Sequence, residues 1–359
     1  MRIAISTGGG DAPGLNAVIR AVVLAAHQRG WQCYGIRRGF GGLLGNDGIM
    51  TLNTAAVRGI THLGGTILGT TNRGNPFRWA TPQPDGSVAE VDRSDDLIAA
   101  FRASGFDALV SIGGDGSLRI AYDLWTKGLP VVGVPKTIDN DVAGTLVTFG
   151  FDSAVTTATE AIDKLHTTAE SHDRVMVVEL MGRDAGWIAL HSAVSSSADI
   201  VLLPEIPFDI ERVCDAIRQR EASGRHYSIV VVAEGARPKG GEAMLVERRA
   251  AGTVDRLGGV GSRVAAAIAE RTGKETRSLV LGHLQRGGGP TTSDRLIALR
   301  FGTAAVRAIA AGSFGTMVAY TPPTISTVPL VDVIGRTKLV PLDSDTLQTA
   351  RDIGISFGD

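Results

Sequence analysis

Short apolar runs alternate along this chain with longer stretches in which apolar residues recur every three or four positions. The short runs are rich in Ile, Val and Leu, a pattern typical of strands buried on both faces of a sheet. Because strand-like and helix-like stretches alternate, the pattern predicts an α/β fold with mostly parallel strands. The predicted strands cover residues 2–6, 108–112, 130–134, 174–180, 228–233 and 278–281.

Glycines follow most of the predicted strands, and the chain has 46 of them among 359 residues. In sheets of this kind ligands bind at the carboxyl ends of the strands, so we expect the chemistry there. A helix is predicted from Leu15 to about Gln28 and another around residues 344–351. Residues 72–94, residues 236–261 and the tail from Thr321 are predicted to be loops or excursions from the sheet.

Charge and composition indicate which kinds of molecule this protein can be expected to bind. Lys and Arg total 36 against 37 acidic residues, so no overall field favours nucleic acid or an anionic membrane. We find no run of roughly 18 apolar residues and no secretory signal near the first strand. The two cysteines form no disulfide framework. These features predict a cytoplasmic protein that acts on small molecules rather than on nucleic acid or membrane.

The segment TGGGDAPGLN at residues 7–16 lies between a predicted strand and a predicted helix. Glycines there let backbone N–H groups face an anion beside a helix N-terminus, which predicts a phosphate site. A tight strand-to-helix turn without a ligand is an equally good interpretation of this segment alone. The segment is neither a Walker A loop nor a complete Gly-x-Gly-x-x-Gly pattern.

Two later segments add carboxylates to the same arrangement. In IGGDGS at residues 112–117, Asp115 follows a strand and is a candidate magnesium ligand, although it could simply cap the next helix. Lys136, Thr137, Asp139 and Asp141 lie within six residues after another strand. Two Asp residues spaced by two in an extended segment point to one side, which suits removal of a hydroxyl proton. An exposed acidic turn is the alternative.

Charged residues also lie at the ends of the later predicted strands. Arg183, Glu234, His283 and Arg286 come from three separate segments, and arginine suits phosphate because its planar fork stays charged. Singly, each is better explained by a surface ion pair or a half-buried imidazole. Their collection at strand ends favours a phosphate-handling site. We find no His-x-x-x-His zinc spacing and no Gly-x-Ser-x-Gly elbow.

These motifs, together with MGR at 181–183 and GHLQRGG at 282–288, resemble the 6-phosphofructokinase family in order and spacing over residues 1–295. The resemblance implies two similar three-layer α/β/α lobes with an active-site cleft between them. Residues 1–150 with about 285–335 would form the donor lobe, which binds ATP and magnesium. Residues 151–284 with about 336–359 would form the lobe that binds fructose 6-phosphate.

The resemblance also assigns roles to residues. Asp139 would accept the proton of the C1 hydroxyl of fructose 6-phosphate, with Thr137 and Asp141 beside it, and Asp115 would hold Mg²⁺. Arg183 would stabilise the transferring phosphoryl group. The implied sugar contacts are Met181, Gly182 and Glu234, and the implied 6-phosphate contacts are His283 and Arg286, joined by Arg174 and Arg277 of a neighbouring subunit. The last assignment implies a homo-oligomer, a tetramer or a dimer.

The phosphoryl donor is predicted from two disagreeing markers. The donor-binding positions implied by the resemblance are Gly10, Phe40, Arg73, Gly116, Ser117 and Lys136. Family members that use pyrophosphate typically have Asp in place of Gly116 and Lys at position 136. Because Gly116 leaves room for a nucleotide and a Lys can also neutralise an ATP phosphate, ATP is the preferred donor, with pyrophosphate as the alternative.

Other protein classes and substrates also fit part of this pattern. A kinase acting on NAD or a lipid would explain Asp115 but not Arg183, Glu234 and His283. A non-catalytic sensor of nucleotides or sugar phosphates would not need Asp139 as a base. Sedoheptulose 7-phosphate is a second possible acceptor. His166 and Asp199 stand where effector-regulated members have Arg and Glu, which argues against regulation by ADP or phosphoenolpyruvate.

Overall fold

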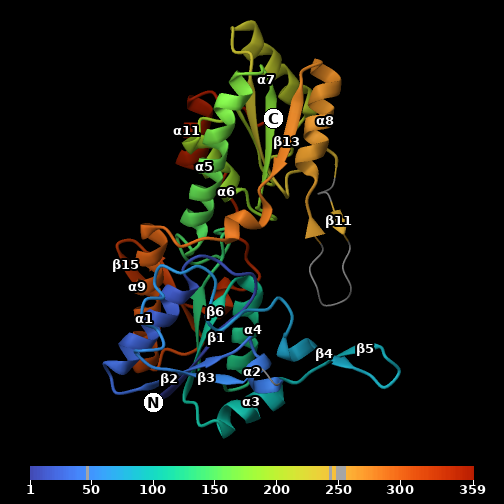
Figure 1. Cartoon of the computed structure of the whole chain (residues 1–359). Helices are drawn as coiled ribbons and strands as arrows, with labels where there is room; N and C mark the ends of the chain where they lie inside the picture. The colour runs from blue at the N-terminus through green and yellow to red at the C-terminus, as the bar shows by residue number, and fades with distance from the viewer. Residues whose placement is uncertain (46–47, 242–244, 248–255) are drawn as a thin grey trace.

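The computed structural model describes residues 1–45, 48–241, 245–247 and 256–359. In that part of the chain the strands form one seven-stranded sheet, one four-stranded sheet and two short antiparallel pairs. Figure 1 shows the seven-stranded sheet in the lower half of the molecule and the four-stranded sheet in the upper half. Most neighbouring strands of the two large sheets are parallel, so the predicted α/β fold with mostly parallel sheets is confirmed.

The larger sheet has the strand order β15-β14-β7-β6-β1-β2-β3, with its only described antiparallel pairings at the two edges. Its central strands are buried over their whole length, which explains why they appear in the sequence as unbroken apolar runs. The strands are β1 (Arg2–Thr7), β2 (Gln32–Ile36), β3 (Ile49–Leu52), β6 (Ala108–Gly113), β7 (Val131–Pro135), β14 (Thr316–Thr321) and β15 (Thr324–Pro329).

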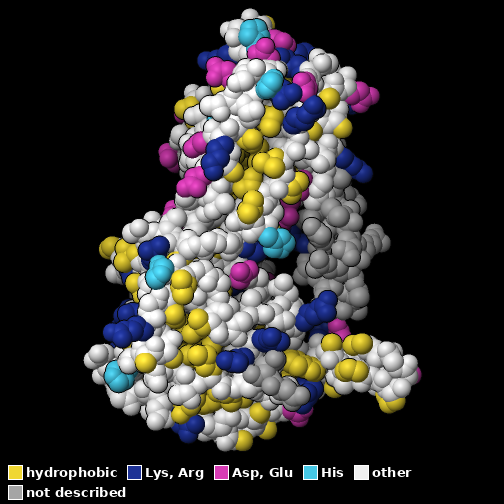
Figure 2. All heavy atoms as spheres, in the orientation of Figure 1, with side chains coloured by type: hydrophobic (Ala, Val, Ile, Leu, Met, Phe, Trp, Pro, Cys, Tyr) yellow, Lys and Arg dark blue, Asp and Glu magenta, His cyan; other side chains and the backbone are white. Residues whose placement is uncertain are grey.

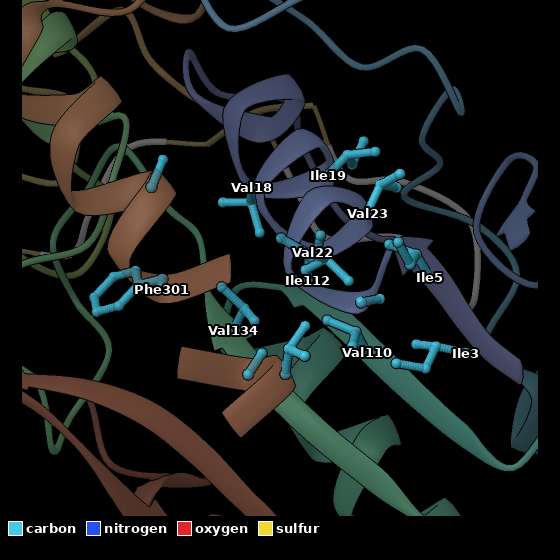
Figure 3. Packing of buried hydrophobic residues seen from close by; sticks show 14 of the residues in the cluster. Ile3, Ile5, Val18, Ile19, Val22, Val23, Val110, Ile112, Val134 and Phe301 are labelled. Atoms are coloured by element: carbon cyan, nitrogen blue, oxygen red, sulfur yellow. The ribbon is translucent and has the colours of Figure 1, made fainter. Parts of the chain in front are cut away.

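Helices cover both faces of this sheet. On one face α1 (Leu15–His27) packs against α9 (Thr292–Ala310), and its buried residues recur at helical spacing. Figure 3 shows Val18, Ile19, Val22 and Val23 of α1 above the strand residues, with Phe301 of α9 beside them. The other face is covered by α2 (Gly41–Leu44), α3 (Ser94–Ala103), α4 (Asp115–Thr126) and α10 (Leu330–Val333).

The smaller sheet is entirely parallel, with the order β13-β8-β10-β9. One apolar cluster joins α5, α6 and α11 to one face, and a second joins α7 and α8 to the other, so this part also has three layers. Its elements are β8 (Val175–Leu180), β9 (Ile200–Leu202), β10 (Ser228–Ala233), β13 (Thr276–Val280), α5 (Phe151–Glu170), α6 (Trp187–Ser195), α7 (Ile210–Ala222), α8 (Val260–Thr272) and α11 (Asp345–Asp352).

Two segments that were predicted to be loops or excursions from the sheet contain regular structure. Residues 72–94 hold η1 (Pro76–Arg78) and a hairpin of β4 (Trp79–Pro82) and β5 (Val88–Val91), which stands outside the large sheets. Asp85 accepts a bond from the backbone N–H of Ser87 at 2.9 Å and thereby closes the turn. The tail from Thr321 likewise forms a hairpin, because β14 and β15 pair across Pro322 and Pro323.

The predicted excursion at residues 236–261 is only partly described. β11 (Leu245–Glu247) pairs with β12 (Arg256–Leu257), and residues 242–244 and 248–255 lie outside the described residues. Among the residues that are described, no helix is long and apolar enough to cross a membrane.

Candidate active site

A cleft of about 840 Å³ opens at the carboxyl ends of β1, β6 and β7, which are adjacent strands of the larger sheet. Figure 2 shows the molecule hollowed at its waist, where basic, acidic and histidine side chains gather. Eleven residues predicted from the sequence line the cleft. They are Gly10, Phe40, Arg73, Asp115, Gly116, Ser117, Lys136, Thr137, Asp139, Asp141 and Arg286.

The loops after β1 and β6 are held together by backbone bonds. The N–H of Gly8 donates to the carbonyl of Ile112 at 3.0 Å, and Ser117 fills the space between the loops. A Cβ on Gly113 would lie 2.2 Å from Cβ of Ser117, so only glycine allows this approach. Because α4 begins at Asp115, its first N–H groups and those of the glycine loop face the cleft, an arrangement that binds anions.

Lys136 is buried between these loops, with 3% of its surface exposed. Its Nζ donates to the carbonyl of Gly10, and its backbone N–H donates to the carbonyl of Gly113 at 2.9 Å. Burial lowers the pKa of Lys136 to about 8, and the positive charge of Arg286 adds to this effect. The ammonium is therefore fixed in place and sparingly solvated, so an anion in the cleft would gain from contact with it.

Thr137, Asp139 and Asp141 follow Lys136 along the same cleft wall. The backbone N–H of Asp139 donates to Oγ1 of Thr137 at 3.1 Å. Burial raises the pKa of Asp139, and burial followed by repulsion from Asp139 raises the pKa of Asp141 to about 6. The segment is not extended as the sequence suggested, because the intervening Asn140 has a φ of +52°. Both carboxylates nevertheless line the cleft.

Asp115 and Gly116 also line the cleft, at the first turn of α4. Oδ1 of Asp115 accepts a bond from the backbone N–H of Gly335 at 3.2 Å, while its side chain stays accessible to the cleft. A Cβ added to Gly116 would meet nothing within 4 Å. The space in front of Gly116 is therefore open.

Phe40 and Arg73 also line the cleft. Phe40 is buried just before α2, whereas Arg73 is exposed on the segment that leads into η1. Several residues around them were missed by the sequence reasoning, since loop residues carry no motif; the only available signal was their position shortly after β2 or before the hairpin. The missed lining residues include Gly39, Thr71, Asn72, Gly74 and Asn75.

The predicted acceptor residues lie mainly at the carboxyl edge of the smaller sheet. Of these residues, Arg286 in η2 (Gly282–Arg286) lines the cleft, where its Nη1 donates to the carbonyl of Asp11 at 3.1 Å. A Cβ on Gly10 would lie 2.9 Å from the same Nη1, so the glycine loop and Arg286 are in close contact. The structure does not place Met181, Gly182, Arg183, Glu234 and His283 in the cleft wall.

Glu234 does not line the cleft, but burial and the negative charge of Asp139 affect its pKa. It follows β10 and is half-buried, and burial raises its pKa to about 7, helped by the negative charges of Asp139 and Glu179. Met181, Gly182 and Arg183 follow β8, where the carbonyl of Gly182 accepts the backbone N–H of Gly235 at 3.1 Å. The two strand ends are thereby held side by side.

Arg174 and Arg277 lie elsewhere in this chain. Both flank Glu275, whose carboxylate is 2.8 Å from Arg174 Nη2 and 2.5 Å from Arg277 Nη2. They stand at the amino ends of β8 and β13, and a six-residue strand spans roughly 20 Å. Neither residue lines the cleft of its own chain.

The cleft combines carboxylates, a glycine-walled anion site, the buried Lys136 and the half-buried Arg286 on an α/β fold. This combination defines a phosphoryl-transfer enzyme. The chain belongs to the phosphofructokinase family, whose sequence pattern matches residues 2–309.

Relatives with two different donors resemble the chain over nearly its whole length. It is 52% identical to an ATP-dependent 6-phosphofructokinase of Chloroflexus aggregans, with 100% of this chain and 98% of that one covered. A pyrophosphate–fructose 6-phosphate 1-phosphotransferase of Amycolatopsis methanolica is 50% identical, with 95% and 96% covered. The T-state phosphofructokinase of Pichia pastoris superposes with a TM-score of 0.80 at 30% identity, covering 98% of this chain and 36% of that chain.

Proposed function

We propose that this protein is an ATP-dependent 6-phosphofructokinase, which transfers a phosphoryl group from ATP to the C1 hydroxyl of D-fructose 6-phosphate and yields fructose 1,6-bisphosphate. The observation that carries the proposal is that Asp139 and Asp141 line the same cleft as Asp115 and the glycine loops. A proton acceptor and an anion site occupy one cavity, as transfer to a hydroxyl requires.

Asp139 is the proposed proton acceptor. Its raised pKa brings the carboxylate nearer to the pH at which a general base works best. Thr137 holds the backbone of Asp139 in place, and Asp141 adds negative charge beside it. Because phosphoryl transfer passes through a loose transition state, placement of the acceptor hydroxyl should contribute more than the strength of the base.

Lys136 and Arg286 are the proposed cations for the donor phosphates and the acceptor phosphate, with Arg183 at the transferring group. Lys136 and Arg286 already lie against the glycine loop, so little reorganisation is needed when charge develops. Gly10, Phe40, Arg73, Gly116 and Ser117 complete the proposed donor site. His283, Met181, Gly182 and Glu234 complete the proposed acceptor site.

Magnesium is the proposed cofactor, and Asp115 is its proposed ligand. No group of three or more His, Cys, Asp or Glu residues suited to a metal occurs among the described residues. That finding fits Mg²⁺, which is commonly bound through one or two carboxylates together with substrate phosphates. When bound, the ion would neutralise charge on the donor phosphates.

The division of the chain into lobes and its assembly are also proposals. Residues 1–150 with about 285–335 would bind the donor, and residues 151–284 with about 336–359 would bind the sugar phosphate. Arg174 and Arg277 would complete the acceptor site of a neighbouring subunit in a homo-oligomer. The position of both residues at the far end of the smaller sheet supports this assignment.

Pyrophosphate is the second candidate donor, favoured by Lys136 and by the Amycolatopsis relative. The open space before Gly116 and the Chloroflexus relative favour ATP. The test is a matrix of ATP and pyrophosphate with fructose 6-phosphate and sedoheptulose 7-phosphate, in the presence of magnesium. We expect kcat/KM to be highest for ATP with fructose 6-phosphate, and turnover with pyrophosphate alone would refute the proposed donor.

A further inference from the structure

A short segment of the chain, residues 335–338, passes between α10 and α11 and contacts both carboxylate-bearing loops of the cleft. The backbone N–H of Gly335 donates to Oδ1 of Asp115 at 3.2 Å. The backbone N–H of Lys338 donates to the carbonyl of Asp141 at 2.8 Å, and Thr337 bridges to Val142. The segment therefore contacts the first turn of α4 and the loop after β7, both of which line the cleft.

The side chain of Lys338 makes a complete set of bonds to the loop that follows β7. Its Nζ donates to Oδ1 of Asn140 at 2.8 Å, to the carbonyl of Thr145 at 3.0 Å and to the carbonyl of Leu146 at 2.9 Å. These bonds use all three donors of an ammonium group. None of the three acceptors is charged, so the side chain holds the loop as a bracket of hydrogen bonds. Burial lowers the pKa of Lys338, whereas the negative charge of Asp141 favours its protonated form.

Asn140 is the residue on which this bracket acts. It stands between Asp139 and Asp141 with a φ of +52°, in the left-handed region that asparagine adopts more readily than most non-glycine residues. Its Oδ1 accepts bonds from the backbone N–H of Thr148 at 3.1 Å and from Lys338. Fixing the Asn140 side chain therefore fixes the direction in which both neighbouring carboxylates leave the backbone.

Lys338 also contacts the loop that carries the proposed transition-state arginine. The indole Nε1 of Trp187 donates to the carbonyl of Lys338 at 2.8 Å, and Nζ of Lys338 lies 5.6 Å from the centre of the indole ring. Trp187 begins α6, four residues after Arg183. One residue thus connects the loop of the proposed base to the loop of Arg183.

We propose that Lys338 is a positioning residue that holds the segment 139–141 in its reactive conformation and in register with the Arg183 loop. This inference rests on the proposed phosphoryl transfer to a hydroxyl. Loss of the bracket should lower kcat, because the proton acceptor is displaced, and should change substrate KM little, because the anion sites remain.

The test compares K338M with K338R and with K127M as a matched control. Lys127 likewise uses its Nζ to hold neighbouring groups, since it donates to Oγ of Ser94 at 2.6 Å and to Oδ1 of Asp95 at 2.8 Å, and lies 5.7 Å from the ring of Phe77. It follows the far end of α4, away from the cleft. We expect K338M to lower kcat on the order of 100-fold with KM changed less than about threefold. K338R, which keeps the charge and the donors, should recover most of the lost kcat, and K127M should stay within about twofold of the wild type.

Thermal unfolding of each variant separates positioning from stability, because all rates are measured well below the lowest unfolding temperature. An unchanged kcat in folded K338M, or an equal loss in K338R, would overturn the inference. Should K338M not fold, kcat is measured for K338Q, whose amide has two donors and no charge and so cannot make all three bonds. An unchanged kcat in K338Q would overturn the inference. A wild-type protein that turns over no donor with fructose 6-phosphate would instead refute the proposed function, which is a distinguishable failure.

Discussion

The candidate phosphate-binding groups at the carboxyl edge of the larger sheet differ in kind from those at the carboxyl edge of the smaller sheet. At the larger sheet, the site consists of glycine loops, helix N-termini and a buried lysine, all tied by backbone bonds such as that from Lys136 to Gly113. At the smaller sheet, the candidate residues are long side chains, of which His283 is exposed and Arg183 half-exposed. The first edge is preorganised within one chain, whereas we expect the second to be completed by substrate and a neighbouring subunit.

The largest effect is expected from removing the proposed base at the preorganised edge. D139A should lower kcat about 10²–10⁴-fold, the usual contribution of a general base, while fructose 6-phosphate still binds. Turnover is measured in a coupled assay, and binding is measured by calorimetry. A fall in kcat of less than tenfold would mean that the larger sheet supplies binding alone.

The next prediction concerns Gly116, which faces open space in the proposed donor site. G116D adds a carboxylate where a Cβ meets nothing within 4 Å, so the fold should tolerate it while the donor phosphates are repelled. We expect kcat/KM for ATP to fall on the order of 100-fold, a loss similar to that of one strong electrostatic contact. G116A, which adds the carbon without the charge, should remain within about tenfold of the wild type, and equal losses in both variants would point to sterics.

A smaller effect tests whether the second edge is shared between subunits. R277A should raise KM for fructose 6-phosphate roughly tenfold or more and leave kcat nearly unchanged, since one phosphate contact is lost. When R277A and D139A subunits are refolded together, some sites combine an intact Asp139 with an intact Arg277 from the neighbour. Those sites should show the wild-type KM, and mixed oligomers without this recovery would contradict sharing.

The last prediction concerns stability rather than turnover, at the contact between the two regions. Oδ2 of Asp294 in α9 accepts bonds from the backbone N–H and Oγ of Ser153 in α5, at 2.8 and 2.6 Å. Burial raises the pKa of Asp294 to about 6 from its ordinary value of 3.8. The folded state therefore binds this proton more tightly than the unfolded state, and the associated stability is lost as the pH rises from about 4 to 6.

D294N keeps a carbonyl oxygen for both bonds but cannot ionise. Relative to the wild type, its free energy of unfolding should improve by about 3 kcal/mol between pH 4 and pH 7, as a two-unit shift implies. Urea unfolding at several pH values measures this difference. Parallel pH profiles for the two proteins would show that Asp294 does not titrate on unfolding.

Much of the preorganised edge could be predicted because its features are local in sequence. Glycines after apolar strands and the run from Lys136 to Asp141 specified which loops would meet, and the structure brings them into one cleft. The predicted family is confirmed by the match over residues 2–309. The catalytic roles of individual residues stay predictions.

The features that escaped prediction depend on contacts between distant segments. The left-handed conformation of Asn140 is one that asparagine tolerates, but the bonds from Thr148 and Lys338 to its side chain join segments that no local pattern connects. Lys338 belongs to no motif and reaches the site from 198 residues away in sequence. The β14–β15 hairpin was hidden by Pro322 and Pro323, which ordinarily argue against strands.

The strand order of the larger sheet bears on how the chain folds as it is synthesised. β7 pairs with β14, which is made about 180 residues later, and α1 packs against α9, which also follows the entire smaller sheet. A nascent chain can complete the smaller sheet while the larger one still has an open edge at β7. An unpaired edge of this kind invites aggregation. We therefore expect ribosome-bound fragments ending before Thr316 to require a chaperone that the full chain does not.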